Sequence, residues 1–545
     1  MPFLAQEHTE ISTKDLLSWS FDNPRYDLDK PIYIDAVNPE RSISGRQGRC
    51  LIRKLVAGFR KAGLKQGDCV VIASFNNLYY PIIVLGIIAA GGVYTGTNPG
   101  YTPHELAHHV NAAHGKFVVS EPELLKPILD ADHDVPKSNV FIFDSLNQPI
   151  PDGFRSWKWL LEHGEEDWVR FDDLNTAKHT LAMLLFSSGT TGLPKAVMLS
   201  HYNLCAQHQL VMEHKRRPYE PSRLLALPMF HAATAPVAHT TPFRSGDVTY
   251  ILRRFELEPF LKYIEKYEIT ELVMVPPICI GIIMSPLSKK YSLKSIKAAA
   301  CGAAPLGKGP QARLKALLSP DAPFTQVWGM TETSCVATMF YYPENDVTGS
   351  VGRMIPNLDC KLVDNDGKDI TAYDTRGEMC VRGPTVVNGY FENPQANARD
   401  WDSDGYFHTG DIVYCDSKSK LWYIVDRKKE LIKVRGFQVA PPELEAVLLS
   451  HPSIIDAAVI GVHLPHASGD ATELPRAYVV QRPGTAKLTE KEVYDFTAEK
   501  LSKYKKLDGG VKFVDMVPGI PKTASGKILK RVLREMAAKE IGAKL

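Results

Sequence analysis

The chain has 545 residues, too many for one ordinary hydrophobic core, and this length predicts two or three domains or subdomains. An apolar fraction of 44%, a charged fraction of 23% and a formal net charge of +2 indicate a globular protein whose overall charge provides no attraction for nucleic acid. The nine cysteines include no close CxxC pair, which argues against both a disulfide framework and a structural zinc site.

The amino-terminal part of the chain bears on export and membrane insertion. The opening MPFLAQEHTEISTKD has no basic segment leading into an apolar one, so no secretory signal is predicted. The longest apolar run, 81-PIIVLGIIAAGGV-93, is shorter than the roughly 20 residues of a transmembrane helix. This run therefore predicts a buried helix, and no transmembrane segment is expected.

A short pattern typical of zinc proteases, 104-HELAH-108, has a simpler interpretation. Two histidines four residues apart on a helix could bind zinc, with Glu105 as the base. Thr102 and Pro103 provide a helix N-cap and a first helical residue, and Glu105 then takes the third position of a capping box. We interpret the segment as the start of a helix and expect no zinc.

Up to residue 425, buried strands alternate with amphipathic helices. The runs 181-LAMLLF-186, 271-ELVMV-275 and 296-IKAAAC-301 predict buried strands, and 256-ELEPFLKYIEKY-267 predicts a helix. Such alternation is typical of α/β proteins. The predicted fold class is therefore α/β, with a large amino-terminal body of α/β subdomains over residues 1–425.

After residue 425 the predicted elements become shorter. A strand, a helix and two strands are followed by a helix whose Thr489 and Glu492 form a capping-box signal. These elements predict a smaller α+β domain over residues 426–545, joined to the body at the charged stretch 426-DRKKE-430. The segments are 431-LIKV-434, 441-PPELEAVLLSH-451, 456-DAAVIGV-462, 476-RAYVVQ-481 and 489-TEKEVYDFTAEKLSKY-504.

A glycine-rich and hydroxyl-rich segment, 187-SSGTTGLPK-195, directly follows the predicted strand 181–186. Its glycines permit a close approach to a ligand, its hydroxyls and amides can surround phosphate oxygens, and its lysine adds charge. It is not a Walker A loop, because that motif requires Ser or Thr where Ala196 stands. The spacing leaves a phosphate loop and a flexible surface loop as alternatives. The candidate ligand residues are Ser187, Ser188, Gly189, Thr190, Thr191, Gly192 and Lys195.

The full string SSGTTGLPKAV resembles the signature (S/T)SGTTGxPKGV of adenylate-forming enzymes, with Ala196 in place of the usual glycine. This family includes acyl-CoA synthetases, 4-coumarate:CoA ligases, beetle luciferases and the adenylation domains of peptide synthetases. The resemblance covers nearly the whole chain, and the wording GFQVAPPELE is most similar to the 4-coumarate:CoA ligase-like branch. The further motifs, in the expected order, are 301-CGAAPL-306, 327-VWGMTE-332, 406-YFHTGD-411, 426-DRKKELIKVRGFQVAPPELE-445 and 521-PKTASGKILKR-531.

The resemblance implies acid–thiol ligation in two steps. The carboxylate attacks the α-phosphorus of ATP to give an acyl-adenylate and pyrophosphate, and the thiol of coenzyme A then displaces AMP. ATP, Mg²⁺ and coenzyme A are the implied cofactors. The resemblance also implies that the small carboxyl-terminal domain is mobile and rotates between the two steps about a hinge near Asp426.

The resemblance assigns roles to several residues of the body. The loop 187–195 would hold the β- and γ-phosphates, Thr331 the α-phosphate, and Glu332 the Mg²⁺ ion, for which a carboxylate is a suitable hard ligand. Outside the family context, a Thr-Glu pair at this point would indicate only a helix start. The implied adenine site consists of Gly302, Ala303 and Ala304 together with Trp328 and Gly329, where Trp328 replaces the usual Tyr or Phe.

Other implied site residues lie toward the carboxyl terminus. Asp411 and Arg427 would bind the ribose, and Lys527 would bridge the attacking carboxylate and the α-phosphate, where its charge complements the anionic transition state. A lysine in a Ser-Gly-Lys turn is by itself an ordinary solvated residue, so this role depends on the resemblance. Lys433 and Gln438 would contact the phosphate or the intermediate, and Arg435, Gly436 and Phe437 would line the tunnel for coenzyme A.

The acid is the least determined part of the implied reaction. By resemblance, His231 lies at the mouth of the acyl pocket and Ala235 on its wall. Val327 stands where the coumarate enzymes have glycine and should narrow the pocket, and 333-TSCVATMF-340 lacks their Gly-Pro-Val wording. We therefore expect an aryl, aryl-alkanoic or medium-chain fatty acid, or a secondary-metabolite carboxylate, rather than 4-coumarate, and the sequence does not rank these.

The chain ends in Ala543-Lys544-Leu545, which resembles the peroxisomal signal Ser-Lys-Leu in its small–basic–Leu pattern. This ending predicts recognition by the peroxisomal import receptor and a peroxisomal location. Without such recognition, the expected location is cytoplasmic.

Three other functions remain open at this point. An adenylating enzyme that loads a carrier protein is disfavoured because no carrier domain follows Lys527, whereas no sequence feature separates the ligase from a luciferase-like oxygenase. A non-catalytic binding or scaffold protein would be expected to have lost Lys527, Asp411 or Glu332. All three residues are present, which favours an enzyme.

Overall fold

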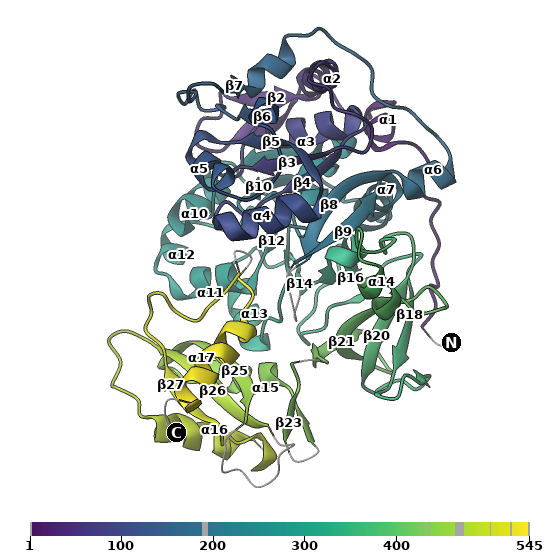
Figure 1. Ribbon diagram of the computed structural model, residues 1–545. Coiled ribbons are helices and arrows are strands. Elements are labelled where there is room, and N and C mark those ends of the chain that lie inside the picture. Colours follow the sequence, from purple (N-terminus) through teal and green to yellow (C-terminus); the bar gives the residue numbers. More distant parts are fainter. Residues whose placement is uncertain are drawn as a thin grey trace. The chain divides into compact units, whose positions relative to one another are not determined.

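A computed structural model describes residues 3–187, 194–428, 430–434, 437–463, 473–501, 503–523 and 526–542, without the side chains of Phe437 and Gln438. The chain divides into two compact units, whose elements are labelled in Figure 1. The body comprises Phe3–Cys360 and Val381–Phe407, and the carboxyl unit comprises Lys361–Cys380 and the chain from His408. The mixture of helices and sheets confirms the predicted α/β class. The joint expected at 426–430 lies inside the carboxyl unit and stays a prediction.

Helices of the body cover two large sheets. They are α1 (Leu16–Phe21), α2 (Gly45–Lys61), α3 (Tyr80–Ala89), α4 (Pro103–Ala112), α5 (Leu125–Leu129), α6 (Leu174–His179), α7 (His201–His208), α8 (Ala235–His239), α9 (Thr241–Ser245), α10 (Leu257–Lys266), α11 (Pro276–Met284), α12 (Leu287–Lys290), α13 (Lys308–Lys315) and α14 (Pro394–Asp400).

The first large sheet has the strand order β7-β6-β5-β3-β4-β8-β9. Neighbouring strands are parallel except β8 and β9, which form an antiparallel hairpin. The strands are β3 (Cys69–Ala73), β4 (Val93–Gly96), β5 (Gly115–Ser120), β6 (Val140–Ile142), β7 (Arg155–Ser156), β8 (Leu181–Ser187) and β9 (Lys195–Ser200).

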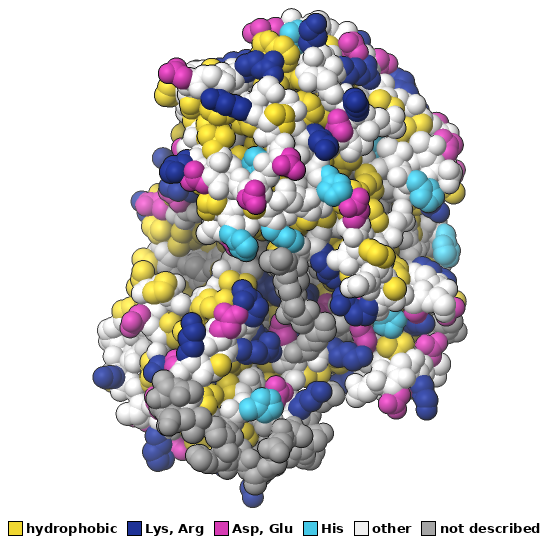
Figure 2. All heavy atoms as spheres, in the orientation of Figure 1, with side chains coloured by type: hydrophobic (Ala, Val, Ile, Leu, Met, Phe, Trp, Pro, Cys, Tyr) yellow, Lys and Arg dark blue, Asp and Glu magenta, His cyan; other side chains and the backbone are white. Residues whose placement is uncertain are grey.

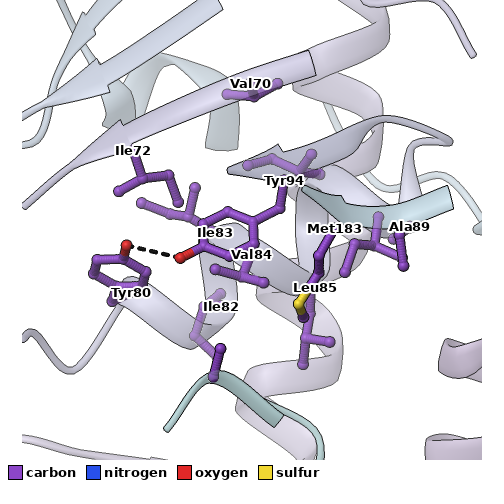
Figure 3. Packing of buried hydrophobic residues seen from close by; sticks show 14 of the residues in the cluster. Val70, Ile72, Tyr80, Ile82, Ile83, Val84, Leu85, Ala89, Tyr94 and Met183 are labelled. Carbon is purple, nitrogen blue, oxygen red and sulfur yellow. Dashed lines mark hydrogen bonds between the residues drawn. The ribbon is translucent and has the colours of Figure 1, made fainter. Parts of the chain in front are cut away.

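Strand β3 shows why both faces of this sheet are covered. Its sequence CVVIA is buried at every position, because successive side chains enter two different hydrophobic clusters. Val70 and Ile72 join the cluster formed with α2 and α3, part of which is shown in Figure 3. Val71 and Ala73 join the cluster formed with α4, which lies in front of the strands in Figure 1.

The second large sheet has the strand order β14-β13-β12-β10-β11-β1-β2, and only β1 and β2 pair in the antiparallel sense. Apolar residues of α10, α11 and α13 form its core. Its strands are β1 (Pro31–Asp35), β2 (Ser42–Ser44), β10 (Ser222–Leu225), β11 (Val248–Ile251), β12 (Glu271–Met274), β13 (Ala298–Cys301) and β14 (Phe324–Gln326). A smaller antiparallel sheet contains β15 (Trp328–Met330), β16 (Cys335–Met339) and β17 (Arg353–Met354).

The predictions for the body are confirmed at the level of elements. The three predicted strands correspond to β8, β12 and β13, and the predicted helix corresponds to α10. Helix α3, within the long apolar run, is buried at each of its 10 positions. Within the described ranges, no helix combines the length and the apolarity that a membrane span requires.

The apparent zinc motif is the amino-terminal part of α4, as predicted. Thr102 caps the helix by accepting from the amide of Glu105, whose side chain accepts from the amide of Thr102 at 2.8 Å. The ring of His108 is hydrogen bonded to the carbonyl of Pro194 at 2.9 Å. The capping box therefore explains the sequence pattern by local backbone chemistry.

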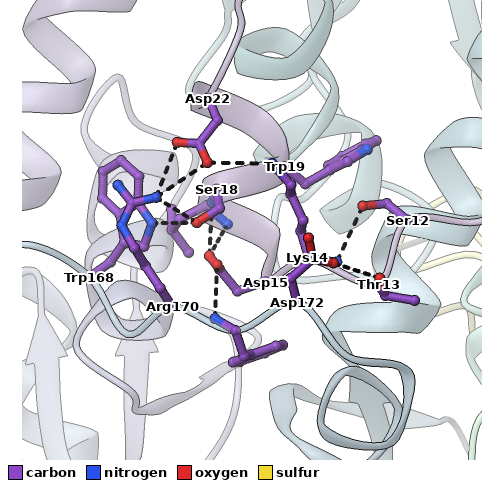
Figure 4. Close-up of polar contacts among 12 residues, drawn as sticks. Ser12, Thr13, Lys14, Asp15, Ser18, Trp19, Asp22, Trp168, Arg170 and Asp172 are labelled. Carbon is purple, nitrogen blue, oxygen red and sulfur yellow. Dashed lines mark hydrogen bonds and ion pairs between the residues drawn. The ribbon is translucent and has the colours of Figure 1, made fainter.

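A polar network holds the segment before the first helix to a distant part of the body (Figure 4). Asp15 is the N-cap of α1 and accepts from the amides of Leu17 and Ser18, at 3.0 and 2.8 Å. Arg170 lies 152 residues from Ser18 in the chain. Its guanidinium donates to the Ser18 hydroxyl at 3.0 Å and to Asp22 at 3.1 Å. This network makes the amino-terminal segment part of the packed body.

The carboxyl unit contains three sheets with the orders β19-β18-β20-β21-β22, β23-β24 and β25-β26-β27. The elements predicted between residues 431 and 504 are present, but the last helix ends at Lys500 rather than Tyr504 because Leu501 is extended, with φ −127° and ψ 156°. The strands are β18 (Asp359–Val363), β19 (Asp369–Ile370), β20 (Gly377–Arg382), β21 (Phe407–Cys415), β22 (Trp422–Arg427), β23 (Ile432–Val434), β24 (Phe437–Val439), β25 (Ile454–Val462), β26 (Leu474–Gln481) and β27 (Gly510–Phe513). The helices are α15 (Pro441–Leu449), α16 (Glu490–Lys500) and α17 (Lys530–Gly542).

Two surface and composition features agree with the sequence analysis. All nine cysteines are free thiols, as expected from their spacing. On the face shown in Figure 2, acidic and basic side chains are interspersed. This mixture is what a net charge of +2 on a globular chain leads one to expect.

Candidate active site

The candidate phosphate loop joins β8 to β9. Ser187 ends β8 and Lys195 begins β9, and these two residues are direct partners in the antiparallel pair. Ser187 is buried, and its hydroxyl has no hydrogen-bond partner among the residues that the structure describes. A buried, unpaired hydroxyl beside this loop fits a phosphate oxygen as its missing partner. The loop residues Ser188, Gly189, Thr190, Thr191 and Gly192 lie outside the described residues.

Two side chains of the body hold Lys195. Its Nζ lies 3.0 Å from Asp400 Oδ2 and 3.7 Å from the centroid of the Tyr390 ring. Burial raises the pKa of Asp400, but Arg399 and Lys195 outweigh this effect and lower it. The Lys195 and Asp400 side chains remain 20% and 17% exposed. The ammonium is therefore held at the start of β9 without being sealed from solvent.

The candidate metal ligand, Glu332, lies in a short 3-10 helix (Thr331–Thr333) directly after β15. Glu332 is 4% exposed, and the Tyr390 hydroxyl donates to its Oε1 at 2.9 Å. Burial and the Glu332 carboxylate raise the pKa of Tyr390 well above its usual value, so the phenol stays protonated and donates. Tyr390 therefore contacts both Lys195 and Glu332, the two residues assigned to the phosphates and the metal.

Unusual backbone geometry fixes the turn that carries Glu332. Ser334 and Cys335 have positive φ angles of 58° and 118°. A Cβ at Gly329 would lie 1.6 Å from the carbonyl oxygen of Cys335, so only glycine fits there. The hydroxyl of Thr333 accepts from the amide of Met330 at 3.0 Å. Backbone conformations of this kind concentrate at functional sites, where the surrounding structure maintains them.

The predicted adenine segment follows the carboxyl end of β13. Such strand ends are the usual ligand-binding edge of parallel sheets. Gly302 is buried, and Ala303 adopts the left-handed conformation with φ 69°. A Cβ at Gly302 would meet the Val327 Cγ2 at 2.9 Å, so the Val327 side chain covers this glycine. Trp328 comes next in the chain and is 8% exposed, and Ala304 is half-buried.

The turn that carries His231 contacts the segment that follows Glu332. The amide of Ala233 donates to His231 Nδ1 at 3.2 Å, and the amide of Ala235 donates to the His231 carbonyl at 2.8 Å. The thiol of Cys335 donates to the carbonyl of Ala233 at 3.6 Å. The structure thus brings together two of the segments that the resemblance assigns to the acyl pocket.

In the carboxyl unit, the two candidate ribose ligands face each other. Asp411 of β21 and Arg427 of β22 are cross-strand partners, with Arg427 Nε 3.1 Å from Asp411 Oδ1. Glu378 accepts from a backbone amide of the turn before Asp411 at 3.2 Å and from Lys428 Nζ at 2.9 Å. Burial raises the pKa of Glu378, but His408 and Lys428 lower it to about 2. Glu378 therefore remains ionised and holds the turn before Asp411 in place.

Lys527 lies in a tight turn of the same unit. Residues 522 and 528 form an antiparallel bridge on either side of it. The amide of Lys527 donates to the Thr523 hydroxyl at 3.0 Å, and its carbonyl accepts from the Thr523 amide at 2.8 Å. The backbone at Lys527 is therefore well defined while its side chain is half-buried.

The remaining predicted residues lie in or near the β23–β24 pair. Lys433 is exposed and is the direct partner of Gln438 in the ladder. Arg435 and Gly436 lie outside the described residues, and Phe437 and Gln438 are described by their backbone alone. Their roles in coenzyme A binding stay predictions.

Three functional residues, Tyr390, Asp400 and Glu378, were not predicted from the sequence. Tyr390 is 58 residues from Glu332, and Asp400 is 205 residues from Lys195, so no spacing rule connects these pairs. One local signal was available, because Asn393 followed by Pro394 is a typical helix start and Asn393 does cap α14. That signal predicts helix α14, but it does not predict that Asp400, the last residue of this helix, contacts Lys195.

The described residues contain no group of three or more His, Cys, Asp or Glu side chains that could hold a metal. Mg²⁺ in nucleotide sites is usually bound by one or two carboxylates together with phosphates and water. A single buried carboxylate in a fixed turn, as at Glu332, fits an ion that arrives with ATP.

Comparison with protein families gives two matches in chain order. The model described as AMP-binding enzyme matches residues 22–391, and the model described as AMP-binding enzyme C-terminal domain matches residues 443–527. The phenylacetyl-CoA ligase epaB of Aspergillus niger is 54% identical over 541 residues, which cover 98% of this chain and 99% of that protein. The acyl-CoA synthetase ACTT5 of Alternaria alternata is 55% identical, covering 93% and 88%, and the 4-coumarate–CoA ligase of Pinus taeda is 34% identical, covering 96% and 95%.

Solved structures show the same architecture. ATP-bound MatB from Rhodopseudomonas palustris superposes with a TM-score of 0.82 at 27% identity, covering 97% of this chain and 99% of that chain. The anthranilate CoA ligase AuaEII, solved with anthranoyl-AMP, superposes with a TM-score of 0.83 at 20% identity, covering 98% and 99%. At that identity the second likeness bears on the fold alone.

Proposed function

The chain belongs to the AMP-binding enzyme family and is an ATP-dependent acyl-CoA ligase, and on this basis we propose that it activates an aryl-alkanoic acid of the phenylacetic type. The observation that carries this choice is the 54% identity to a phenylacetyl-CoA ligase, which covers 98% of this chain. Val327, which stands where the coumarate enzymes have glycine, would narrow the acyl pocket. Such a pocket would disfavour the long rigid side chain of a cinnamate and would accommodate a ring on one methylene.

Adenylation brings two anions together, so the site must neutralise charge and hold the reactants in line. We assign Ser187 and Lys195 to the outer phosphates and Thr331 to the α-phosphate. Mg²⁺ held by Glu332 would supply further positive charge to the phosphates. Lys527 would bridge the carboxylate of the acid and the α-phosphate, where its charge stabilises the transition state.

The nucleoside is assigned to polar groups for its ribose and to an aromatic ring for its base. The cross-strand pair of Asp411 and Arg427 supports a ribose site, because a buried carboxylate can accept from both ribose hydroxyls. Glu378 and its partner Lys428 would keep the turn before Asp411 in place. Trp328 would offer its ring to adenine.

In the second step, the thiol of coenzyme A attacks the acyl carbon, a thioester forms, and AMP leaves. We propose that the part of the carboxyl unit that follows Asp426 rotates about this residue, so that residues 435–437 line the entry of the thiol. Lys433 and Gln438 would contact the intermediate from the same unit. This assignment is supported by the family membership and by the position of the β23–β24 pair immediately after residue 430.

We further propose a peroxisomal location through recognition of Ala543-Lys544-Leu545 by the import receptor. Fusion of the last dozen residues to a fluorescent reporter tests this directly. Punctate fluorescence that becomes diffuse when Leu545 is deleted supports the proposal. Diffuse fluorescence from the intact tail would exclude it.

The function is tested with purified protein, ATP, Mg²⁺ and coenzyme A against phenylacetate, phenylpropanoates, cinnamates and fatty acids of several lengths. AMP release and the mass of the thioester are measured. Phenylacetyl-CoA should form fastest, and Lys527→Ala should lower adenylation by at least about 100-fold, the loss typical for a group that stabilises transition-state charge. Adenylate without thioester would indicate loading of a carrier protein, and oxygen uptake with light would indicate a luciferase-like oxygenase.

A further inference from the structure

A buried lysine of the carboxyl unit has no role in the chemistry assigned above. Lys530 is the first residue of α17, its side chain is 7% exposed, and its Nζ lies 3.5 Å from Glu430 Oε2 and 3.4 Å from Glu445 Oε1. Asp426 lies near this ammonium and is 5% exposed, and its Oδ2 has no hydrogen-bond partner among the described residues. One ammonium is thus enclosed with three carboxyl groups.

The four groups come from different parts of the unit. Asp426 belongs to β22, and Glu430 follows in the stretch where the hinge is expected. Glu445 lies on α15, and its Oε1 also accepts from the amide of Val459 in β25 at 2.9 Å. Lys530 therefore connects the start of α17 with the end of β22 and with the core of the unit.

The chain between Lys527 and Lys530 is short and braced. The amide of Leu529 donates to the carbonyl of Pro521 at 2.9 Å, and the bridge between residues 522 and 528 closes the turn that carries Lys527. No loose loop separates the two lysines. A displacement of the Lys530 backbone therefore moves the Lys527 turn as well.

A contribution to stability does not by itself explain why a lysine is buried at position 530. Burying an ion pair costs desolvation energy, and a cation in the first turn of a helix opposes the helix dipole. Burial lowers the pKa of Lys530, but Glu445 and Glu430 raise it above its usual value, so the ammonium remains charged. Its two ion-pair distances exceed the roughly 2.7–2.9 Å of charge-assisted hydrogen bonds, so the ammonium attracts both glutamates at once rather than forming one close hydrogen bond.

We propose that Lys530 is a positioning residue for adenylation: its ammonium holds the turn that carries Lys527 against the segment that follows β22. When the ammonium is removed, three carboxyl groups are left without their shared cation, and the turn loses its anchor. Lys530 touches neither substrate nor nucleotide in this role. The inference rests on the proposed function, in which Lys527 acts in adenylation and not in thioester formation.

The test measures the two half-reactions separately in the full chain. ATP–pyrophosphate exchange with phenylacetate reports adenylation, and thioester formation from supplied phenylacetyl-AMP and coenzyme A reports the second step. The variants are Lys530→Met, Lys530→Arg to restore the charge, and Lys539→Met as the control at an exposed lysine of the same helix. Lys530→Met should lower exchange by about 100-fold, the cost of misplacing a catalytic group by about 1 Å. Thioester formation should change by less than about 3-fold, and Lys530→Arg should recover most of the exchange.

The outcomes separate this inference from the proposed function. Equal loss in both half-reactions, or no loss in either, would overturn the role of Lys530. If Lys530→Met does not fold, Glu430→Gln decides, because a selective loss of exchange supports the role and unchanged exchange overturns it. If Lys527→Ala retains exchange, the proposed function of Lys527 fails, whatever Lys530 does.

Discussion

Two lysine–carboxylate clusters, one in each unit, differ in how tightly they enclose their cation. In the body, Lys195 forms a 3.0 Å ion pair with Asp400, and its side chain is 20% exposed. In the carboxyl unit, Lys530 lies 3.4 and 3.5 Å from two glutamates, and its side chain is 7% exposed. Lys195 therefore has a closer carboxylate partner and a more exposed side chain. Lys530 has more carboxylate partners and is almost fully buried.

This difference indicates different uses of the same pair of chemical groups. A partly exposed ion pair contributes little to stability, so Lys195 can leave Asp400 for a phosphate at small cost. An enclosed cation cannot leave its carboxylates without stranding buried charge, so Lys530 is suited to holding structure in place. The comparison therefore separates a cation that is available to a ligand from a cation that maintains geometry.

The largest effect is expected from a change at Tyr390, which contacts both Lys195 and the candidate metal ligand Glu332. Tyr390→Phe keeps the ring under Lys195 but removes the hydroxyl that donates to Glu332 at 2.9 Å. A hydrogen bond to a charged group contributes about 1.5–3 kcal/mol, so adenylation should fall by roughly 10- to 100-fold. The Mg²⁺ concentration for half-maximal exchange should rise, because the carboxylate is no longer oriented. Binding of MgATP, measured by calorimetry, provides a readout that does not depend on turnover.

Tyr26→Phe is the matched control for this substitution. Tyr26 also donates a phenolic hydrogen bond in the body, but to the backbone carbonyl of Phe243 at 2.7 Å. This variant should change stability without changing the dependence on Mg²⁺. A normal Mg²⁺ curve for Tyr390→Phe would show that Glu332 does not need Tyr390.

An intermediate effect is expected from a change at Asp426, which should alter how the stability of the fold depends on pH. Burial raises the pKa of Asp426 from its usual value near 4 to about 7. The folded state therefore binds a proton that the unfolded state releases between these pH values, and the resulting stabilisation is lost as pH rises through 7. Asp426→Asn retains an acceptor for the Arg427 amide and should remove this loss, so that its Tm relative to wild type rises by about 2 °C or more between pH 5 and pH 8.

Exposed Asp515 provides the control for the Asp426 experiment, since Asp515→Asn should leave the pH profile unchanged. If Asp426→Asn and wild type lose stability in parallel between pH 5 and pH 8, Asp426 is already ionised at pH 5. In that case the enclosed cluster holds three charged carboxylates, and the contrast between the two clusters becomes sharper.

The sequence predicted what local rules determine. Strand β8, helix α10 and the caps at Thr102 and Thr489 follow from periodicity and from hydrogen bonding within one turn. Several candidate site residues, such as Glu332 and Asp411, were identified because the family motifs are contiguous strings. The structure places them in well-defined turns that no local rule specifies.

What the sequence could not predict depends on contacts between distant segments. Nothing near Tyr390 indicates that its hydroxyl will meet a carboxylate 58 residues earlier. Lys530 is preceded by Ile528 and Leu529 and followed by Arg531, and a lysine in such a place is normally solvated. Its burial becomes visible only when α15 and the end of β22 are placed beside it. Long-range electrostatic clusters are therefore the part of the site that the folded structure reveals and the sequence does not.

The smallest effect, and the most direct challenge to the comparison, is expected from Asp400→Asn. If Asp400 only holds Lys195 until ATP arrives, removing its charge eliminates a competitor of the phosphate. The KM for ATP should then fall by roughly 2- to 5-fold, the equivalent of a partly exposed ion pair, while kcat stays nearly constant. Glu344→Gln, which breaks the exposed pair with Arg353, should leave the KM unchanged. A higher KM for Asp400→Asn would mean that Asp400 aims Lys195 at the phosphates, so that both clusters maintain geometry and exposure alone does not distinguish their roles.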